Sequence, residues 1–417
     1  MRQVNPSWKL VTAVISVLLT LFVWQQGLKG SFDRPSVAPK LSLAQHEMAL
    51  VASPVIPKPL KPILVGLDPE ETLKQILLEI PENQIEDREK LIVATLEASE
   101  DKRQSFLNFS LKDEKLLPLQ NALQKVSNPS DITLSNVLVL ESFKKDPLLY
   151  QVSCFALGGS DSTCVDRMAS KAMALRLIGV QAFPLFATVI GLGFLIRQGW
   201  LIARKKNIPW PVLSLLPLSL VDMTLLIAGG FVILGEVVFP TFLVPLSSFV
   251  IKEIPSPMNE SLKVFVGYIS MTLPPLFILR QQLKGLNKLE APKGGWLQWN
   301  LKPVTSSIFN AISAWLMIMP FVLFTGWLMN VFLGDQGGSN PLLDLVLNSH
   351  NTWALVLLLI TTVVVAPVFE ELIFRGALLP VLAKDIGRFW GVIVSALVFA
   401  LAHLSVGELP PLFVLGI

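Results

Sequence analysis

Two adjacent glutamates, an arginine and a histidine lie within one of the most apolar stretches of the chain, and these residue types could support hydrolysis. They are Glu370, Glu371, Arg375 and His403. Ionisable side chains at membrane depth are costly unless they are paired or face a polar cavity, so such a cluster is a functional-site hypothesis. A carboxylate and a histidine that share one water molecule form a suitable pair for general base catalysis.

The spacing of these residues predicts separate roles for the two glutamates. Side chains of neighbouring residues on a helix point about 100° apart, so both carboxylates cannot address one substrate atom. Glu371 and Arg375 are four residues apart and predict an internal ion pair that supports the site. Glu370 is left to face the cavity as the catalytic carboxylate. Phe399 lies one turn before His403 and is expected to pack beneath it.

The stretch from Trp353 to Ser405 predicts a helical hairpin that positions these residues. If the arms run from Glu370 to Lys384 and from Trp390 to His403, they rise by about 21 Å and 20 Å at about 1.5 Å per residue. Glu370 and His403 would then lie level with each other. The turn is marked by residues that end helices and prefer water, namely Lys384, Asp385, Gly387 and Arg388.

The two motifs also carry a family resemblance. Glu370-Glu371-x-x-x-Arg375 and Phe399-x-x-x-His403 resemble the first two motifs of the CAAX-protease and bacteriocin-processing family of glutamate-dependent intramembrane endopeptidases. The resemblance covers residues 306–417. It implies that Glu370 and His403 activate the water, and that the substrate is a peptide or protein, which is prenylated in the best-known cases. The family pattern continues into a later helix with a second histidine and an asparagine, but this chain stops at Ile417 before such a helix is complete. We therefore expect this chain to be an inactive fragment of a longer protein.

A metal-dependent mechanism is the alternative to metal-free hydrolysis, because members of this family have often been described as metalloproteases. Zinc prefers three or more protein ligands, commonly including histidine. One histidine and two glutamates, with Glu371 expected to pair with Arg375, are a poor ligand set, and the chain has no H-E-x-x-H motif. The sequence therefore favours hydrolysis without a metal or other cofactor, with zinc as a poorly supported alternative.

The sequence alone leaves two non-proteolytic functions open. The same fold could serve as a catalytically inactive membrane scaffold or an immunity-like protein, in which the charged residues only hold helices together. A transporter would use intramembrane charges for an ion path. The transporter reading is weaker, because the sequence has no evident inverted repeat or matching pair of broken helices.

The composition predicts an all-α, polytopic transmembrane bundle. The chain has 417 residues, of which 52% are hydrophobic and 16% charged, and a mean hydropathy of +0.59. These values exclude an ordinary soluble enzyme and make the lipid bilayer the first partner. The net charge of +3 is too small to indicate nucleic acid binding.

Basic residues predict the topology. Lys9 precedes an apolar run from Leu10 to Trp24, so residues 1–30 are interpreted as a retained signal anchor with Met1 in the cytoplasm. This arrangement resembles cyanobacterial or plastid members of the family, and a bacterial, thylakoid or plasma membrane is expected. Cytoplasmic loops are indicated by the cluster Arg197, Arg204, Lys205 and Lys206.

Residues 31–176 are predicted to lie on the opposite side of the membrane. Residues 31–67 contain six prolines between Pro35 and Pro62 and predict an extended linker. Residues 68–176 predict a small helical domain, in which Cys154 and Cys164 are candidates for a disulfide. Its helices are expected to begin after Asp68 and to cover Asp87–Glu100, Leu116–Val126 and Asp131–Phe143.

Residues 177–305 predict transmembrane helices and basic loops, before the protease core at 306–417. Spans are expected at 177–196, 212–233 and 264–279, and proline-broken residues 235–262 predict a re-entrant or interfacial segment. With the later spans this gives seven complete spans and an eighth that begins near Leu409. The lone carboxylates Asp222 and Glu236 are interpreted as hydrogen-bond partners within the bundle.

Overall fold

The computed structural model describes residues 7–34, 37–80, 85–97, 99–125, 134–205, 213–299, 301–334, 341–349 and 351–417. These residues form helices and turns and contain no β-strand, as the composition predicts. They divide into two compact units, Ala38–Ala187 and a second unit made of Met1–Val37 with Thr188–Ile417. The predictions that concern Met1 and Lys206 fall outside the described residues.

Six helices in the described ranges are long and apolar enough to cross a membrane, so the chain is a multi-pass membrane protein. A seventh apolar helix, α20 (Arg388–Leu401), has 14 residues, and α21 (Leu409–Gly416) has eight. The six long helices are α1 (Ser7–Phe32), α11 (Arg167–Ala203), Leu220–Ile251, α14 (Met258–Lys284), α15 (Val304–Leu333) and Thr352–Ile386.

The third span differs from the prediction, which ended it at Ile233 and broke the chain after Gly235. The helix instead continues to Ile251, through α12 (Leu220–Thr224), the π-helical segment η3 (Leu225–Val238) and α13 (Phe239–Ile251). Pro240 and Pro245 lie within this continuous helix. Prolines are tolerated within membrane helices when neighbouring groups satisfy the freed carbonyls. The predicted end of the span at Ile233 and the proline break after it were therefore wrong.

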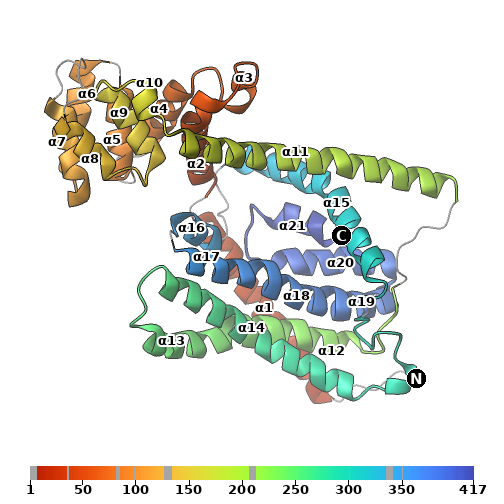
Figure 1. Cartoon of the computed structure of the whole chain (residues 1–417). Coiled ribbons are helices and arrows are strands. Elements are labelled where there is room, and N and C mark those ends of the chain that lie inside the picture. The colour runs from red at the N-terminus through yellow and green to blue at the C-terminus, as the bar shows by residue number, and fades with distance from the viewer. Residues whose placement is uncertain are drawn as a thin grey trace. The chain divides into compact units, whose positions relative to one another are not determined.

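Glycines allow η3 and α14 to pack backbone against backbone, and α1 contacts η3 as well (Figure 1). A Cβ atom on Gly235 would lie 2.5 Å from the carbonyl oxygen of Met271, and one on Gly230 would lie 3.3 Å from the Cα of Pro275. A side chain at Gly235 would clash with the α14 backbone, and one at Gly230 would require α14 to shift slightly. These contacts bring the middle of α14 close to the middle of η3.

The C-terminal part of the unit that contains Thr188–Ile417 has one long helix with π-helical segments, a helical hairpin and short connecting helices. The long helix from Thr352 to Ile386 contains α17 (Thr352–Leu359), η5 (Ile360–Val365), α18 (Ala366–Glu370), η6 (Glu371–Leu378) and α19 (Leu379–Ile386). Segments η5 and η6 are π-helical. Figure 1 shows α19 and α20 side by side, with α21 next to α20, and both pairs are in contact. The short helices are η4 (Lys288–Glu290) and α16 (Pro341–Asn348).

The unit Ala38–Ala187 has its own hydrophobic core and is built from short helices, as predicted. Asp68 caps α4, accepting a hydrogen bond from the Glu71 amide. The elements are α2 (Ala38–Ala52), η1 (Ser53–Val55), α3 (Lys61–Leu64), α4 (Pro69–Glu79), α5 (Asp87–Leu96), α6 (Glu100–Leu107), η2 (Glu114–Leu116), α7 (Leu117–Lys125), α8 (Leu134–Glu141), α9 (Pro147–Ala156), α10 (Asp161–Cys164) and the start of α11. Residues 131–133 of one predicted helix lie outside the described ranges.

The prediction of an extended linker over residues 31–67 was wrong. Helix α2 occupies Ala38–Ala52, and its Leu43, Leu50 and Val51 belong to the core of this unit. The physical reason is the position of the prolines. Pro39 lies in the first turn of α2, and the next proline follows the helix, so the run between them is free to be helical.

Arg88 explains why α2 packs as part of this unit. Its guanidinium lies 2.7 Å from Glu47 Oε1 on α2 and 2.5 Å from Asp146 Oδ2 at the start of α9. Burial alone would lower the pKa of Arg88, but the hydrogen bonds to Asp146 and Glu47 hold this pKa above its usual value. One arginine on α5 thus ties three helices together.

Cys154 on α9 and Cys164 on α10 form a disulfide in the structure, with Cα atoms 5.4 Å apart, and both side chains are buried. Because disulfides persist on the oxidising side of a membrane, the bond also bears on topology. We expect mass analysis of non-reduced peptides from isolated membranes to find the linked pair. Two thiols that are freely alkylated in fresh membranes would contradict both the disulfide and the extracytoplasmic position.

Candidate active site in the C-terminal hairpin

The hairpin predicted around Gly387 is present. Helix α19 ends at Ile386, Gly387 adopts a φ of +86°, and α20 begins at Arg388. A glycine adopts this backbone conformation without the clash that a Cβ would cause. Lys384 donates a hydrogen bond to the carbonyl oxygen of Leu218, so a charged residue of the turn also anchors the hairpin to the segment before α12.

Two contacts fix the register of the arms. A Cβ on Gly391 would lie 2.8 Å from the amide nitrogen of Ala383, so α20 approaches the backbone of α19 closely there. Further along, the rings of Phe374 and Phe399 meet edge to face with centroids 5.4 Å apart. Phe374 and Phe399 lie equally far from the turn in sequence. Four residues beyond them on each arm stand Glu370 and His403.

Glu370 is the last residue of α18, and its carboxylate contacts a residue that sequence reasoning missed. The hydroxyl of Tyr268, on α14, donates a hydrogen bond of 3.3 Å to Glu370 Oε1. The Tyr268 ring also meets Phe369 edge to face, at 6.4 Å between centroids. A signal was present in the sequence, since Tyr268 lies inside an apolar span, where a tyrosine hydroxyl needs a polar partner.

His403 lies in the turn after α20, because that helix ends at Leu401 rather than at the histidine. Its Nδ1 is 2.9 Å from the carbonyl oxygen of Phe399. A carbonyl only accepts hydrogen bonds, so Nδ1 must carry the hydrogen, and in the neutral ring Nε2 then has the free lone pair. The His403 ring packs on the Phe399 ring with centroids 4.8 Å apart.

Glu371 and Arg375 form the predicted pair, with Nη1 and Oε1 3.2 Å apart, but the pair is not internal. The side chain of Arg375 is 24% exposed, whereas that of Glu371 is 61% exposed. The Arg375 guanidinium lies over the Phe399 ring, 4.4 Å from Cζ to the centroid. Arg375 and Phe399 therefore form a stack, the His403 ring meets Phe399 edge to face, and Glu371 contacts this stack through Nη1 of Arg375.

This asymmetry changes what is expected of the two residues. Arg375→Ala should destabilise the fold by about 2–3 kcal/mol, because it removes a desolvated cation–π contact and the packing of the arginine stem. Glu371→Ala should cost less than Arg375→Ala, because the Glu371 carboxylate touches only Nη1 of Arg375 and takes no part in the contact of Arg375 with Phe399. Thermal unfolding of the purified protein in detergent would compare them. Equal losses of stability would mean that the ion pair, and not the stack, is what matters.

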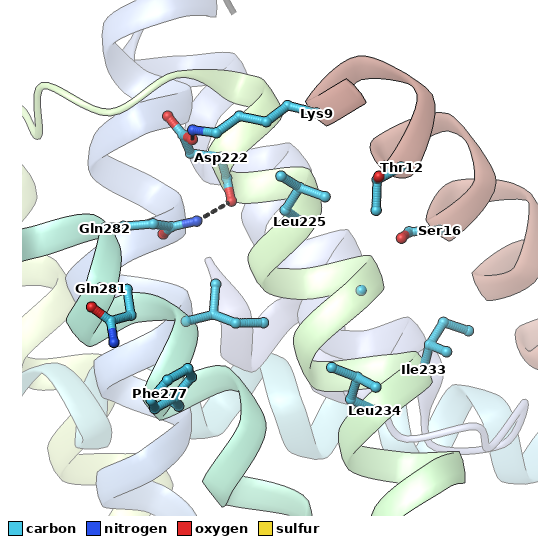
Figure 2. A pocket seen from close by; sticks show the side chains of 12 residues that line it. Lys9, Thr12, Ser16, Asp222, Leu225, Ile233, Leu234, Phe277, Gln281 and Gln282 are labelled. Atoms are coloured by element: carbon cyan, nitrogen blue, oxygen red, sulfur yellow. Dashed lines mark hydrogen bonds and ion pairs between the residues drawn. The ribbon is translucent and has the colours of Figure 1, made fainter. Parts of the chain in front are cut away.

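Of the two other carboxylates singled out from the sequence, Asp222 is a structural partner as predicted. It caps α12 together with Ser219 and forms an ion pair with Lys9 Nζ at 3.1 Å, while Gln282 donates to its backbone carbonyl oxygen. Lys9, Asp222 and Gln282 border a cavity of about 510 Å³ between α1, η3 and α14 (Figure 2). Its remaining walls are mostly apolar, including Leu225, Ile233, Leu234 and Phe277.

Glu236 on η3 differs from the prediction. Its Oε2 is buried and makes no hydrogen bond within the described ranges, so it is not the bundle partner that we expected. Gly235 beside it contacts the α14 backbone at Met271, three residues after Tyr268 in the sequence.

The residues present do not fit a metal centre. In the part of the chain that the structure describes, no three His, Cys, Asp or Glu side chains come together. Zinc in proteins requires at least three such ligands. The carboxylate of Glu371 is already next to Arg375, and Glu370 Oε1 accepts from Tyr268.

Comparison with known families finds two separate matches along the chain. Residues 38–175 match a Domain of unknown function (DUF8675), which covers most of the unit Ala38–Ala187. Residues 352–417 match the family described as Type II CAAX prenyl endopeptidase Rce1-like. No curated protein and no solved structure matches the chain. The hairpin that carries Glu370 and His403 is thus similar to a segment of the CAAX prenyl endopeptidases, a family of proteases.

Proposed function

We propose that the protein is an intramembrane endopeptidase of the CAAX prenyl protease type, in which Glu370 and His403 activate water to hydrolyse a peptide bond. The observation that carries the proposal is the register of the hairpin within the matched segment. The contacts of Gly391 and Phe399 with the opposite arm, continued by one helical turn, lead to Glu370 on one arm and His403 on the other. The two side chains share no hydrogen bond or ion pair in the described structure, which is compatible with a water molecule between them.

The hydrogen bonds of the two side chains support a division of labour on that water. One hydrogen of the water would point to the Glu370 carboxylate and the other to Nε2 of His403, whose Nδ1 faces the Phe399 carbonyl. The water lone pair is then free to attack the substrate carbonyl carbon. As the new C–O bond forms, Glu370 takes the proton, and it returns this proton to the leaving amine when the C–N bond breaks. Tyr268 occupies Glu370 Oε1 and leaves Oε2 for the water.

The proposed substrate class is a peptide or protein in or at the membrane, with a prenylated C-terminal peptide as the first choice. This choice rests on the printed description of the matching family. The proposed reaction is hydrolysis of an internal peptide bond, so the products are a shortened chain and a released short peptide. The N-terminus and the basic loop near Lys205 are proposed to face the cytoplasm, from the distribution of basic residues.

The direct test is hydrolysis in liposomes by the purified full-length protein. Three substrates should be compared: a farnesylated CAAX peptide, the same peptide without the lipid, and a transmembrane peptide. We expect cleavage of the farnesylated peptide, with product masses that locate the cut, and none by the Glu370→Gln variant. If the folded full-length protein cleaves none of the three, the inactive scaffold is the better reading.

A further inference from the structure

The C-terminal end of α1 contacts the turn that follows His403. The guanidinium of Arg34 donates a hydrogen bond to the carbonyl oxygen of Leu404, and a second one of 3.3 Å to that of Gly27. The backbone N–H of Val406 donates to Ser31 Oγ at 3.0 Å. Ser31 in the last turn of α1 and Arg34, two residues after that helix, thus bind two backbone groups of residues 404–406, which we call the His403 turn.

Packing and backbone conformation indicate that this contact is needed. A Cβ on Gly27 would lie 2.9 Å from the Leu404 side chain, so Leu404 rests on the bare backbone of α1. Leu404 has a φ of +51°, in the left-handed region that a residue with a side chain rarely adopts. Such conformations persist where the surroundings over-determine them, often at active sites. Here the surroundings are Gly27, Ser31 and Arg34.

We propose that Arg34 and Ser31 are positioning residues for His403, and that α1 is thereby part of the active site. The reason lies in how His403 is held. Its ring is fixed on one side by the Phe399 carbonyl, but its backbone lies beyond the end of α20 at Leu401. The His403 turn must therefore set where the ring nitrogen Nε2 points. Arg34 and Ser31 hold this turn from outside the hairpin.

This inference rests on the proposed role of His403, and it adds a group from far outside the matched segment 352–417. A misplacement of about 1 Å can cost about 10²-fold in rate, even when the mutated residue does not touch the substrate. Arg34→Ala is therefore expected to lower kcat by about that factor, with little change in KM. Arg34→Lys should recover part of the loss, because one donor can still reach a carbonyl oxygen.

The test combines turnover with a direct view of His403. The chain has three histidines, so a His46→Gln, His350→Gln background leaves His403 as the single source of histidine signals. In that background, NMR of protein with isotope-labelled histidine reports the ring tautomer and environment. Arg34→Ala and the milder Ser31→Ala should each move the His403 signals away from the Nδ1–H state. Lys29→Ala is the matched control, a basic, exposed residue of the same helix without a described partner.

The two readouts separate failure of this inference from failure of the proposed function. If Glu370→Gln cleaves as well as the unmutated protein, the proposed function fails, yet the NMR experiment still tests the contact of α1 with the His403 turn. If Arg34→Ala and Ser31→Ala leave both kcat and the His403 signals unchanged in folded protein, the inference is overturned. The same holds if Lys29→Ala causes equal changes.

Discussion

Glu370→Gln and His403→Ala are each expected to lower peptide hydrolysis by at least about 10³-fold, and the double variant should be no slower than either single variant. Groups that act as a unit on one water are strongly non-additive, since removing one member already disables the other. The measurement is kcat/KM for the same substrate in all four proteins, with folding checked by thermal unfolding.

The neighbouring glutamate supplies the matched control. Glu371→Gln changes the same chemical group one residue away, on a side chain that is 61% exposed and paired with Arg375. It should keep most of the activity. Tyr268→Phe removes the donor to Glu370 Oε1. Its activity should lie between those of Glu370→Gln and Glu371→Gln, at about a 10-fold loss. Full activity in Glu370→Gln, or equal losses in Glu370→Gln and Glu371→Gln, would mean that the catalytic carboxylate has been assigned wrongly.

Gly391→Val is expected to abolish activity by a different route, by separating the arms of the hairpin. A Cβ at this position would meet the backbone nitrogen and Cα of Ala383 at 2.8 and 2.9 Å, and backbone atoms cannot move aside as a flexible side chain can. We expect a loss of stability of about 1–3 kcal/mol, as for other overpacked sites. Displacement of His403 should lower kcat by about 10²-fold or more.

Gly376→Ala is the control for this variant. A Cβ there would lie 3.6 Å from the carbonyl oxygen of Glu371 and 3.7 Å from the Leu297 side chain, which are ordinary contact distances. Unfolding temperature and turnover of both variants should be measured in the same detergent and lipid. If Gly391→Val is as stable and active as Gly376→Ala, the close approach at Gly391 does not set the geometry of the site.

The sequence was sufficient for features that depend on local patterns. The hairpin was predictable because Lys384, Asp385, Gly387 and Arg388 separate two apolar runs. The short helices after Asp68 were predictable from caps and apolar spacing. The proline-rich segments were misread for the same reason. Local rules treat a proline as a break, whereas Pro39 lies in the first turn of α2 and Pro240 lies within a continuous apolar helix.

Contacts across long sequence separations could not be predicted in this way. Nothing near Tyr268 indicates that its hydroxyl meets Glu370, because that contact depends on how α14 packs against η3 and the hairpin. The exposure of Glu371 also had to come from the packed structure, since spacing alone gives the pair but not its surroundings. Arg34 was read only as part of a linker, although its partner is the Leu404 carbonyl.

The contact between Arg34 and Leu404 also has a consequence for the order of events during synthesis. The two residues are 370 positions apart, and Ser31 and Val406 are 375 apart. At about 5–20 residues per second, the ribosome produces residue 404 roughly 20–75 s after Arg34. Helix α1 therefore spends this interval in the bilayer with the binding surface for the His403 turn exposed. If His403 needs that support, a nascent chain cannot hydrolyse neighbouring membrane proteins until its hairpin has been made and has docked against its first helix.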